Sequence, residues 1–201
     1  MGEALLKLLS QNLQDSKVTM QEAMLFTSQA ANKYIREMIW QNKAMGETTI
    51  PYYALKDYEI DTQLDESRDM LYAKLPIRTL DNVYQNMGIF QVVPCNDYSQ
   101  AMIPLNKGFL AMYRNMPSYG IEGNLGFIPE RDRIYIYGAD PTENIKIVAT
   151  LIPDCTSLNP DEEMPLPTDA ETDVLNLAIG QLQVTLQIPQ DMVTNNKYEN
   201  I

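Results

Sequence analysis

The chain of 201 residues contains no histidine. Histidine is the commonest general base in enzymes and the commonest metal ligand, so its absence excludes a Ser-His-Asp triad, a Cys-His dyad and a histidine-based zinc site. Chemistry that uses two carboxylates, as in glycosidases, remains open. The acidic residues here cluster at turns and helix starts, where capping and solvation explain them. We therefore predict no enzyme and no catalytic residue.

Cysteine is scarce as well, with only Cys95 and Cys155. Metal sites usually contain at least one close pair such as Cys-x-x-Cys, and these two residues lie far apart in the sequence. We expect both thiols to be reduced and packed, and we predict no metal and no cofactor. The segment DCTSLNPDEE (154–163) offers oxygen ligands for calcium, but it lacks the regular Asp-x-Asp-x-Asp-Gly spacing.

No apolar run approaches the length that is needed to cross a bilayer. The short apolar stretch at the N-terminus is interrupted by Lys7, and no small-residue cleavage site follows it, so no export signal is predicted. Gly2 does not fit a myristoylation motif, because Leu6 stands where Ser or Thr is required. We expect a soluble protein that is made in a cytoplasm.

Basic residues are absent between Lys146 and Lys197, and the net charge of the whole chain is −12. A nucleic-acid-binding protein needs a basic stripe that displaces counterions from phosphates, so specific DNA or RNA binding is not expected. Either a solvated acidic face, or an acidic surface that meets a basic partner or keeps DNA from adhering, explains this stretch. Its acidic residues are Asp154, Asp161, Glu162, Glu163, Asp169, Glu171, Asp173 and Asp191.

A long amphipathic helix is predicted from about Met20 to Met45. Thr19 and Glu22 have the spacing of a capping box, apolar residues then recur with helical period, and Gly46 provides a stop. A shorter helix is expected over residues 3–15.

The two helices predict a helical hairpin over residues 1–46. Its apolar face is wide for the surface that a small β-domain covers, and such a face often marks an interface. Packing in an ordinary core explains the face equally well. It includes Phe26, Tyr34, Ile39 and Trp40.

Residues 47–155 predict a β-rich domain. Short apolar segments separated by Pro and Gly favour a small antiparallel β-sandwich or barrel. The clearest strand is 133–137, where Ile134 and Ile136 alternate with Arg and Tyr residues. The other expected strands lie in TIPYYALKDYEID (49–61), DMLYAKLP (69–76), GIFQVVPC (88–95), QAMIPL (100–105) and IKIVATLIPD (145–154), and NKGFLAMYRNM (106–116) suggests a short helix.

Three regularly spaced glycines occur in YGIEGNLG (119–126). A dinucleotide-binding fingerprint needs a strand before its glycines and a helix after them, whereas here a strand is expected after the glycines. A P-loop is excluded too, because no Lys-Ser or Lys-Thr pair is present. We predict a loop leading into a hairpin, in which Gly120, Gly123 and Gly126 supply positive φ angles for turns.

Residues 156–201 predict an acidic, proline-rich link, a closing helix and a polar tail. Thr168 and Glu171 have the spacing of a second capping box, and a helix is expected from about Asp169 to Leu186. Its apolar stripe contains Val174, Leu177, Ala178, Gln181 and Leu182. The three regions together predict an α+β protein that is one structural domain: N-terminal helical hairpin, small β-sandwich or barrel, C-terminal helix.

The order of these elements resembles the small neck and connector proteins of tailed bacteriophages, in particular the ring and adaptor proteins of crAss-like podoviruses. The similarity covers residues 19–196. The phrases that carry it are IYIYGAD (134–140), Pro-Leu-Pro before the last helix (165–167) and IPQD after it (188–191).

The resemblance implies a non-enzymatic virion protein of the phage neck, made in the host cytoplasm. Such a protein forms a homo-oligomeric ring, matched to the expected twelve-fold symmetry of the portal, and joins portal and tail. DNA passes through the ring without specific binding, and no membrane is involved. The twelve methionines suit surfaces that repack on assembly, and an acidic lining would let phosphates slide.

A carbohydrate- or peptide-binding β-sandwich module is the alternative. It predicts exposed aromatic residues on one sheet face, a role for which Tyr135 and Tyr137 are available. Cross-strand tyrosines are usually structural, however. This alternative also predicts an export signal, which the sequence does not show.

Overall fold

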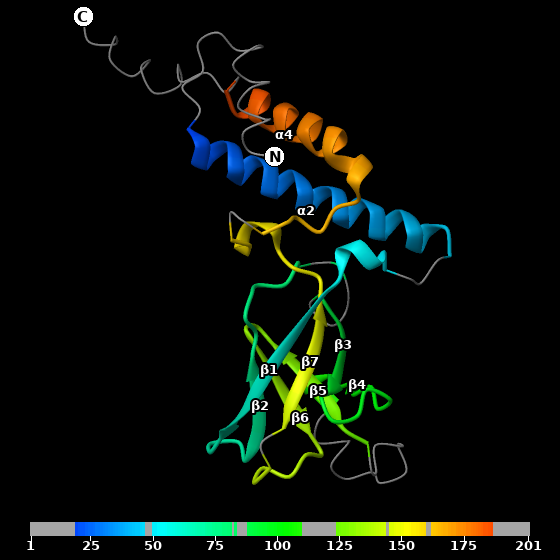
Figure 1. Cartoon of the computed structure of the whole chain (residues 1–201), viewed down its shortest axis with the longest axis vertical. Helices are drawn as coiled ribbons and strands as arrows, with labels where there is room; N and C mark the ends of the chain where they lie inside the picture. The colour runs from blue at the N-terminus through cyan, green and yellow to red at the C-terminus, as the bar shows by residue number, and fades with distance from the viewer. Residues whose placement is uncertain are drawn as a thin grey trace, which may run out of the picture. The chain divides into compact units, whose positions relative to one another are not determined.

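The computed structural model describes residues 19–46, 50–81, 83, 88–109, 124–143, 145–159 and 162–186. The chain divides into two compact units. The helical unit comprises the described residues up to 34 and from 166 onward, and the β unit comprises those from 35 to 165. Figure 1 shows the elements of both.

Helix α2 spans Met20–Ala44 and confirms the predicted long helix. Its start is a capping box, as expected. The Glu22 carboxylate accepts a hydrogen bond from the Thr19 N–H (2.8 Å), and the Thr19 hydroxyl accepts one from the Glu22 N–H (3.3 Å). The helix stops before Gly46, whose φ of +82° is a left-handed conformation that glycine adopts readily.

In the helical unit, α4 (Glu171–Leu186) runs antiparallel beside the first part of α2 (Figure 1). The predicted apolar stripe of α4 is confirmed, because Val174, Ala178 and Leu182 are fully buried. In the part of α2 that belongs to this unit, most of the buried residues are small. These residues are Ala23, Thr27, Ala30 and Ala31.

The start of α4 differs from the prediction. A 3-10 turn, η5 (Thr168–Ala170), precedes the helix, and Pro167 occupies its N-cap position without any side-chain capping bond. The predicted capping box of Thr168 and Glu171 is therefore wrong. The backbone supplies the bond instead, because the Ala170 N–H donates to the Pro167 carbonyl (3.0 Å).

The β unit contains a seven-stranded sheet with the order β3-β7-β1-β2-β6-β5-β4. Neighbouring strands are antiparallel except for β4 and β5, which are parallel. The strands are β1 (Lys56–Asp65), β2 (Met70–Lys74), β3 (Ile89–Pro94), β4 (Ile103–Pro104), β5 (Gly126–Glu130), β6 (Arg133–Tyr137) and β7 (Lys146–Leu151).

The sheet curls, so that strands from both ends of its order contribute to one core (Figure 1). The Met102 N–H, just before β4, donates to the Val92 carbonyl of β3 (2.8 Å) and links the two ends. Ile134 and Ile136 point into this core, as predicted for β6. The buried core residues are Leu71, Ala73, Leu75, Ile89, Val92, Met102, Phe127, Ile134, Ile136, Ile147, Ala149 and Leu151.

The α+β class is thus confirmed, with a helix before the sheet and a helix after it. The sheet is mixed and curls like half of a barrel, where an antiparallel sandwich or barrel was expected. Alternation predicts which residues of a strand face the core, but it does not predict which strands pair. The helix expected over 3–15, the tail after Ile188 and residues 110–116 of the suggested short helix lie outside the described part of the chain.

The strand expected over residues 49–61 begins later, at Lys56. Pro51 instead precedes a 3-10 turn, η1 (Tyr52–Ala54), which the Leu55 N–H closes by donating to the Tyr52 carbonyl (3.1 Å). The pyrrolidine ring fixes φ at a value that suits a turn and provides no N–H for a strand ladder. The tyrosine-rich composition that predicted a strand here therefore belongs to a turn.

The last residue of the glycine-rich segment, Gly126, is the first residue of strand β5. Gly126 does not have a positive φ, so the prediction that it serves a turn is wrong. A Cβ at this position would lie 2.5 Å from Cδ1 of Leu105, which shows that the glycine is needed for close packing. Gly120 and Gly123 lie outside the described residues.

Candidate interaction surfaces

Among the described residues, no group of three or more Cys, Asp or Glu side chains is placed to hold a metal ion. In the calcium candidate 154–163, Asp154 is buried. Its carboxylate accepts hydrogen bonds from the N–H (2.9 Å) and the hydroxyl (2.7 Å) of Thr156, and it lies 3.6 Å from Nε of Arg78. Asp154 therefore caps the 3-10 turn that follows it and forms an ion pair.

No helix in the described part of the chain is long and apolar enough to cross a membrane.

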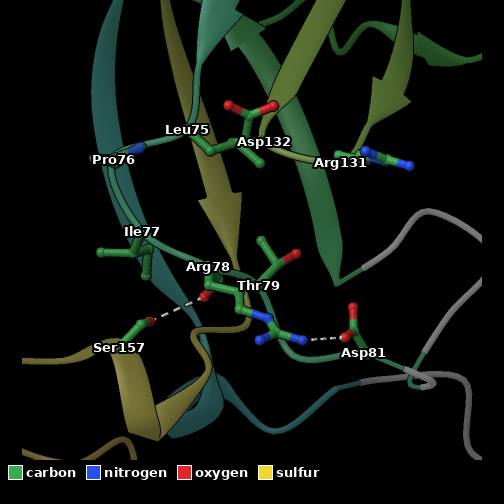
Figure 2. Close-up of a pocket in the computed structure, with 9 residues that line it drawn as sticks. All are labelled: Leu75, Pro76, Ile77, Arg78, Thr79, Asp81, Arg131, Asp132 and Ser157. Carbon is green, nitrogen blue, oxygen red and sulfur yellow. Dashed lines mark hydrogen bonds and ion pairs between the residues drawn. The ribbon is translucent and has the colours of Figure 1, made fainter.

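A hollow of about 560 Å³ lies between the segment after β2, the β5–β6 turn and the turn after β7 (Figure 2). Arg78 is one of the charged residues that line this hollow. Nη2 of Arg78 lies 2.9 Å from Oδ2 of Asp81, and this hydrogen bond, with the charges of Asp81 and Asp154, raises the pKa of Arg78. Because two carboxylates compensate its charge, Arg78 supports the structure and is not an open anion site.

Backbone hydrogen bonds hold the walls of this hollow in place. The Leu75 N–H donates to the Asp132 carbonyl (2.8 Å), and the Asp154 N–H donates to the Arg78 carbonyl (2.9 Å). The Ser157 hydroxyl also donates to the Arg78 carbonyl (3.3 Å), as Figure 2 shows. The walls of the hollow are thus joined by hydrogen bonds, and we assign no ligand to it.

A second hollow, of about 480 Å³, shares Arg131 and Asp132 with the first. Four of the fifteen basic residues of the chain line it, together with two carboxylates, although the whole chain has a net charge of −12. We term this area the basic surface. It consists of Arg68, Lys107, Arg131 and Arg133, with Glu130, Asp132 and Tyr135.

Tyrosine rings underlie two of these arginines, on the sheet face opposite to Ile134 and Ile136. The Arg68 guanidinium lies 4.4 Å from the ring centroid of Tyr135, and that of Arg133 lies 4.8 Å from the centroid of Tyr72. Tyr135 is only 4% exposed, and its hydroxyl donates to Asp65 (3.0 Å). Tyr135 is therefore structural and does not form the open aromatic platform that a carbohydrate-binding module needs.

The carboxylates of the basic surface compensate only part of its positive charge. Glu130 pairs with both Lys107 and Arg68, and these two cations lower the pKa of Glu130, Lys107 having the larger effect. Nε of Arg133 lies 4.0 Å from Oδ1 of Asp132, which is the upper limit for an ion pair. Arg131 makes no hydrogen bond or ion pair with any other residue that the structure describes. Positive charge therefore remains available to a partner.

The helices expose several large apolar side chains. Trp40, the only tryptophan of the chain, is 56% exposed, while its neighbour Ile39 is buried. Successive helical residues point about 100° apart, so the wide apolar face predicted for this helix is divided between core and solvent. Phe26 and Tyr34 are half-buried. The exposed large apolar residues of α2 and α4 are Met20, Leu25, Trp40 and Val184.

The start of α4 carries exposed carboxylates that no cation of the described residues compensates. Asp169, Glu171 and Asp173 are all exposed, and none of them forms an ion pair with another described residue. Burial, and then the charges of Asp169 and Asp173, raise the pKa of Tyr34. Part of the acidic stretch predicted from the sequence is thus an open, negatively charged helix start.

Sequence reasoning found the acidic stretch and missed the basic surface. Arg131 and Arg133 are close in the sequence, but Arg68 and Lys107 join them only through the pairing of β2, β6 and β5 and the chain path after β4.

The chain matches no protein-family model, and no curated protein matches its sequence. Its function must therefore be inferred from these surfaces.

Proposed function

We propose that the chain is a non-enzymatic virion protein, a ring or adaptor subunit that joins portal and tail in the neck of a tailed bacteriophage. The observation that carries the proposal is the exposure of Trp40, which is 56%. Tryptophan is enriched among the residues that contribute most to protein interfaces. Within the subunit the Trp40 ring is contacted by the Lys43 ammonium, 5.3 Å from its centroid, and more than half of the residue stays exposed. An assembly that covers Trp40 accounts for its position.

A ring requires two different contact surfaces on each copy, one for each neighbour. The chain offers surfaces of different chemistry: apolar residues and carboxylates on its helices, and the basic surface on its sheet. The expected partners are further copies in a twelve-fold ring, the portal, and the tail or other neck proteins.

The charge of the chain supports passage of DNA through such a ring. With a net charge of −12, the assembly repels phosphates at long range, so DNA slides through the conduit without being held.

Tyr135, one of the two tyrosines available to the carbohydrate- or peptide-binding alternative, does not support it. Tyr135 is buried beneath Arg68, and the hydroxyl of the neighbouring Tyr72 donates to Gln63 (2.8 Å). A half-buried Tyr137 by itself does not make a sugar platform. We therefore do not propose this function.

The mass of the purified full chain tests the proposal. Native mass spectrometry or light scattering is applied to the chain alone and after mixing with a portal ring. We expect a cyclic multimer, or a monomer that assembles on the portal. A monomer that associates neither with itself nor with the portal would contradict the proposal.

A further inference from the structure

We propose that the basic surface binds the acidic start of α4 of a second copy of this chain. The inference rests on the proposed ring and names the contact between neighbouring subunits. One side is formed by Arg68, Lys107, Arg131 and Arg133, and the other by Asp169, Glu171 and Asp173.

Arg131 is the residue that points most directly to a partner. It occupies the turn between β5 and β6 with a φ of +51°, a left-handed conformation that is unfavourable for a bulky side chain. Asn, Asp or Gly is the usual residue at such a hairpin turn. The pairing of β5 with β6 imposes this turn, and the guanidinium of Arg131 makes no hydrogen bond or ion pair within the described part of the chain. A contact outside the subunit accounts for an arginine at this position.

The partner must be anionic, and the acidic start of α4 has the matching chemistry. Its carboxylates are exposed and lack cationic partners among the described residues. Guanidinium groups bind carboxylates through two parallel hydrogen bonds, which gives the pair a defined geometry. The tyrosine rings beneath Arg68 and Arg133 hold those two side chains in place before binding, which lowers the entropic cost.

A contact between two different surfaces has a consequence for assembly. Each copy uses its basic surface toward one neighbour and its acidic helix start toward the other, so the arrangement is head-to-tail. Such a contact closes into a ring when the rotation that relates neighbouring subunits is a whole-number fraction of a full turn. This is the symmetry that the proposed function requires.

The phosphate backbone of a nucleic acid is the other polyanion that a basic surface can bind. The net charge of −12 disfavours it, because the chain as a whole repels phosphates. The acidic start of α4 of a second copy is shorter than a nucleic-acid backbone and has a lower charge density. Its repulsion by the net negative charge of the chain is therefore smaller.

Charge reversal tests the contact in the full-length chain by native mass spectrometry and light scattering. We expect Arg131→Glu to weaken self-association by about tenfold or more, and Glu171→Arg to do the same. Lys146→Glu, an exposed cation outside the basic surface, changes the net charge equally and is expected to leave association as in the wild type. An equimolar mixture of the Arg131→Glu and Glu171→Arg chains should recover assembly, since each interface then pairs opposite charges.

A second variant separates binding from folding. Arg131→Gly relieves the positive φ, so its melting temperature should equal or exceed that of the wild type, while self-association falls as for Arg131→Glu. A ring that withstands both Arg131 variants would overturn the inference and leave the ring proposal standing. The same holds if the mixture of the two reversed chains does not assemble.

Three further outcomes test the contact between copies or the proposed function. A wild-type monomer that joins only a portal would overturn the contact between copies but retain the adaptor function. A monomer indifferent to the portal would overturn both proposals. Retention of duplex DNA at physiological salt that is lost in Arg131→Gly would overturn the inference and assign the basic surface to nucleic acid.

Discussion

At the scale of single residues, Gly126 positions strand β5 by having no side chain. An added methyl group would lie 2.5 Å from Cδ1 of Leu105 and 3.3 Å from the Ile103 carbonyl oxygen. Leu105 is buried and has little freedom to move. We expect Gly126→Ala to lower the free energy of unfolding by about 1–3 kcal/mol, the usual cost of overpacking. Urea denaturation followed by circular dichroism measures this change.

Gly180 in α4 provides the matched control. A Cβ added there meets no atom within 4 Å. Because alanine is favoured over glycine in a helix by roughly 0.5–1 kcal/mol, Gly180→Ala should raise the free energy of unfolding. If both substitutions changed stability equally, the packing role of Gly126 would be disproved.

The two cysteines should differ in reactivity. Neither forms a disulfide, and Cys155 is only 3% exposed. Burial, and then the charge of Asp154, raise the pKa of Cys155 to about 12, so almost no thiolate is present at pH 8. We expect a thiol reagent such as DTNB to leave Cys155 unmodified in the folded protein and to react slowly with the half-buried Cys95. In a Cys95→Ser variant, modification of the folded chain should be absent until denaturant is added; rapid modification would contradict the prediction.

At the scale of elements, local signals in the sequence predicted helices better than strand pairing. The capping box, the period and the stop of α2 all involve residues within a few positions of one another, and all three are confirmed. The same spacing failed at Thr168 and Glu171, because Pro167 had already directed the chain into a 3-10 turn. A capping motif is therefore reliable only where the residue before it leaves the backbone free to adopt the cap conformation.

The capping box of α2 should make stability depend on pH. Hydrogen bonds from Thr19 lower the pKa of Glu22 below the ordinary value of 4.5. A lowered folded-state pKa means that the stabilisation is complete above about pH 4.5 and is lost as the pH falls through the folded-state pKa. We expect Glu22→Gln to lower the melting temperature near neutral pH, and the difference from the wild type to vanish in acid.

Glu163→Gln serves as the control for that measurement, because Glu163 is an exposed carboxylate outside any helix start. Its melting temperature should follow that of the wild type at every pH. A Glu22→Gln difference that stayed constant from neutral to acidic pH would show that the carboxylate does not stabilise the helix start through its charge.

At the scale of the whole molecule, Trp40 and Ile39 separate assembly from folding. Trp40 is exposed and Ile39, the residue before it, is buried. Trp40→Ala should change the free energy of unfolding of the monomer by about 0.5 kcal/mol or less, but reduce self-association or portal binding by roughly thirtyfold, as for an interface hot spot. Ile39→Ala should instead cost about 2–5 kcal/mol of stability. Thermal melts and native mass spectrometry of both variants test this, and a large loss of monomer stability in Trp40→Ala would place that residue in the core.

The sequence by itself determined the properties that depend on composition or on neighbouring residues. These are the absence of histidine chemistry, the acidic charge, the long capped helix and the aliphatic face of β6. Each follows from residue identity or from a short period, so no knowledge of distant contacts is needed.

Only the tertiary structure decided which distant segments meet. The parallel pairing of β4 with β5, the packing of Gly126 against Leu105 and the gathering of Arg68, Lys107 and Arg131 all join residues that are separated along the chain. Such contacts depend on strand order and on the curl of the sheet, which local alternation does not encode. For this reason the sequence indicated the acidic side of the proposed contact, and only the fold revealed the basic side.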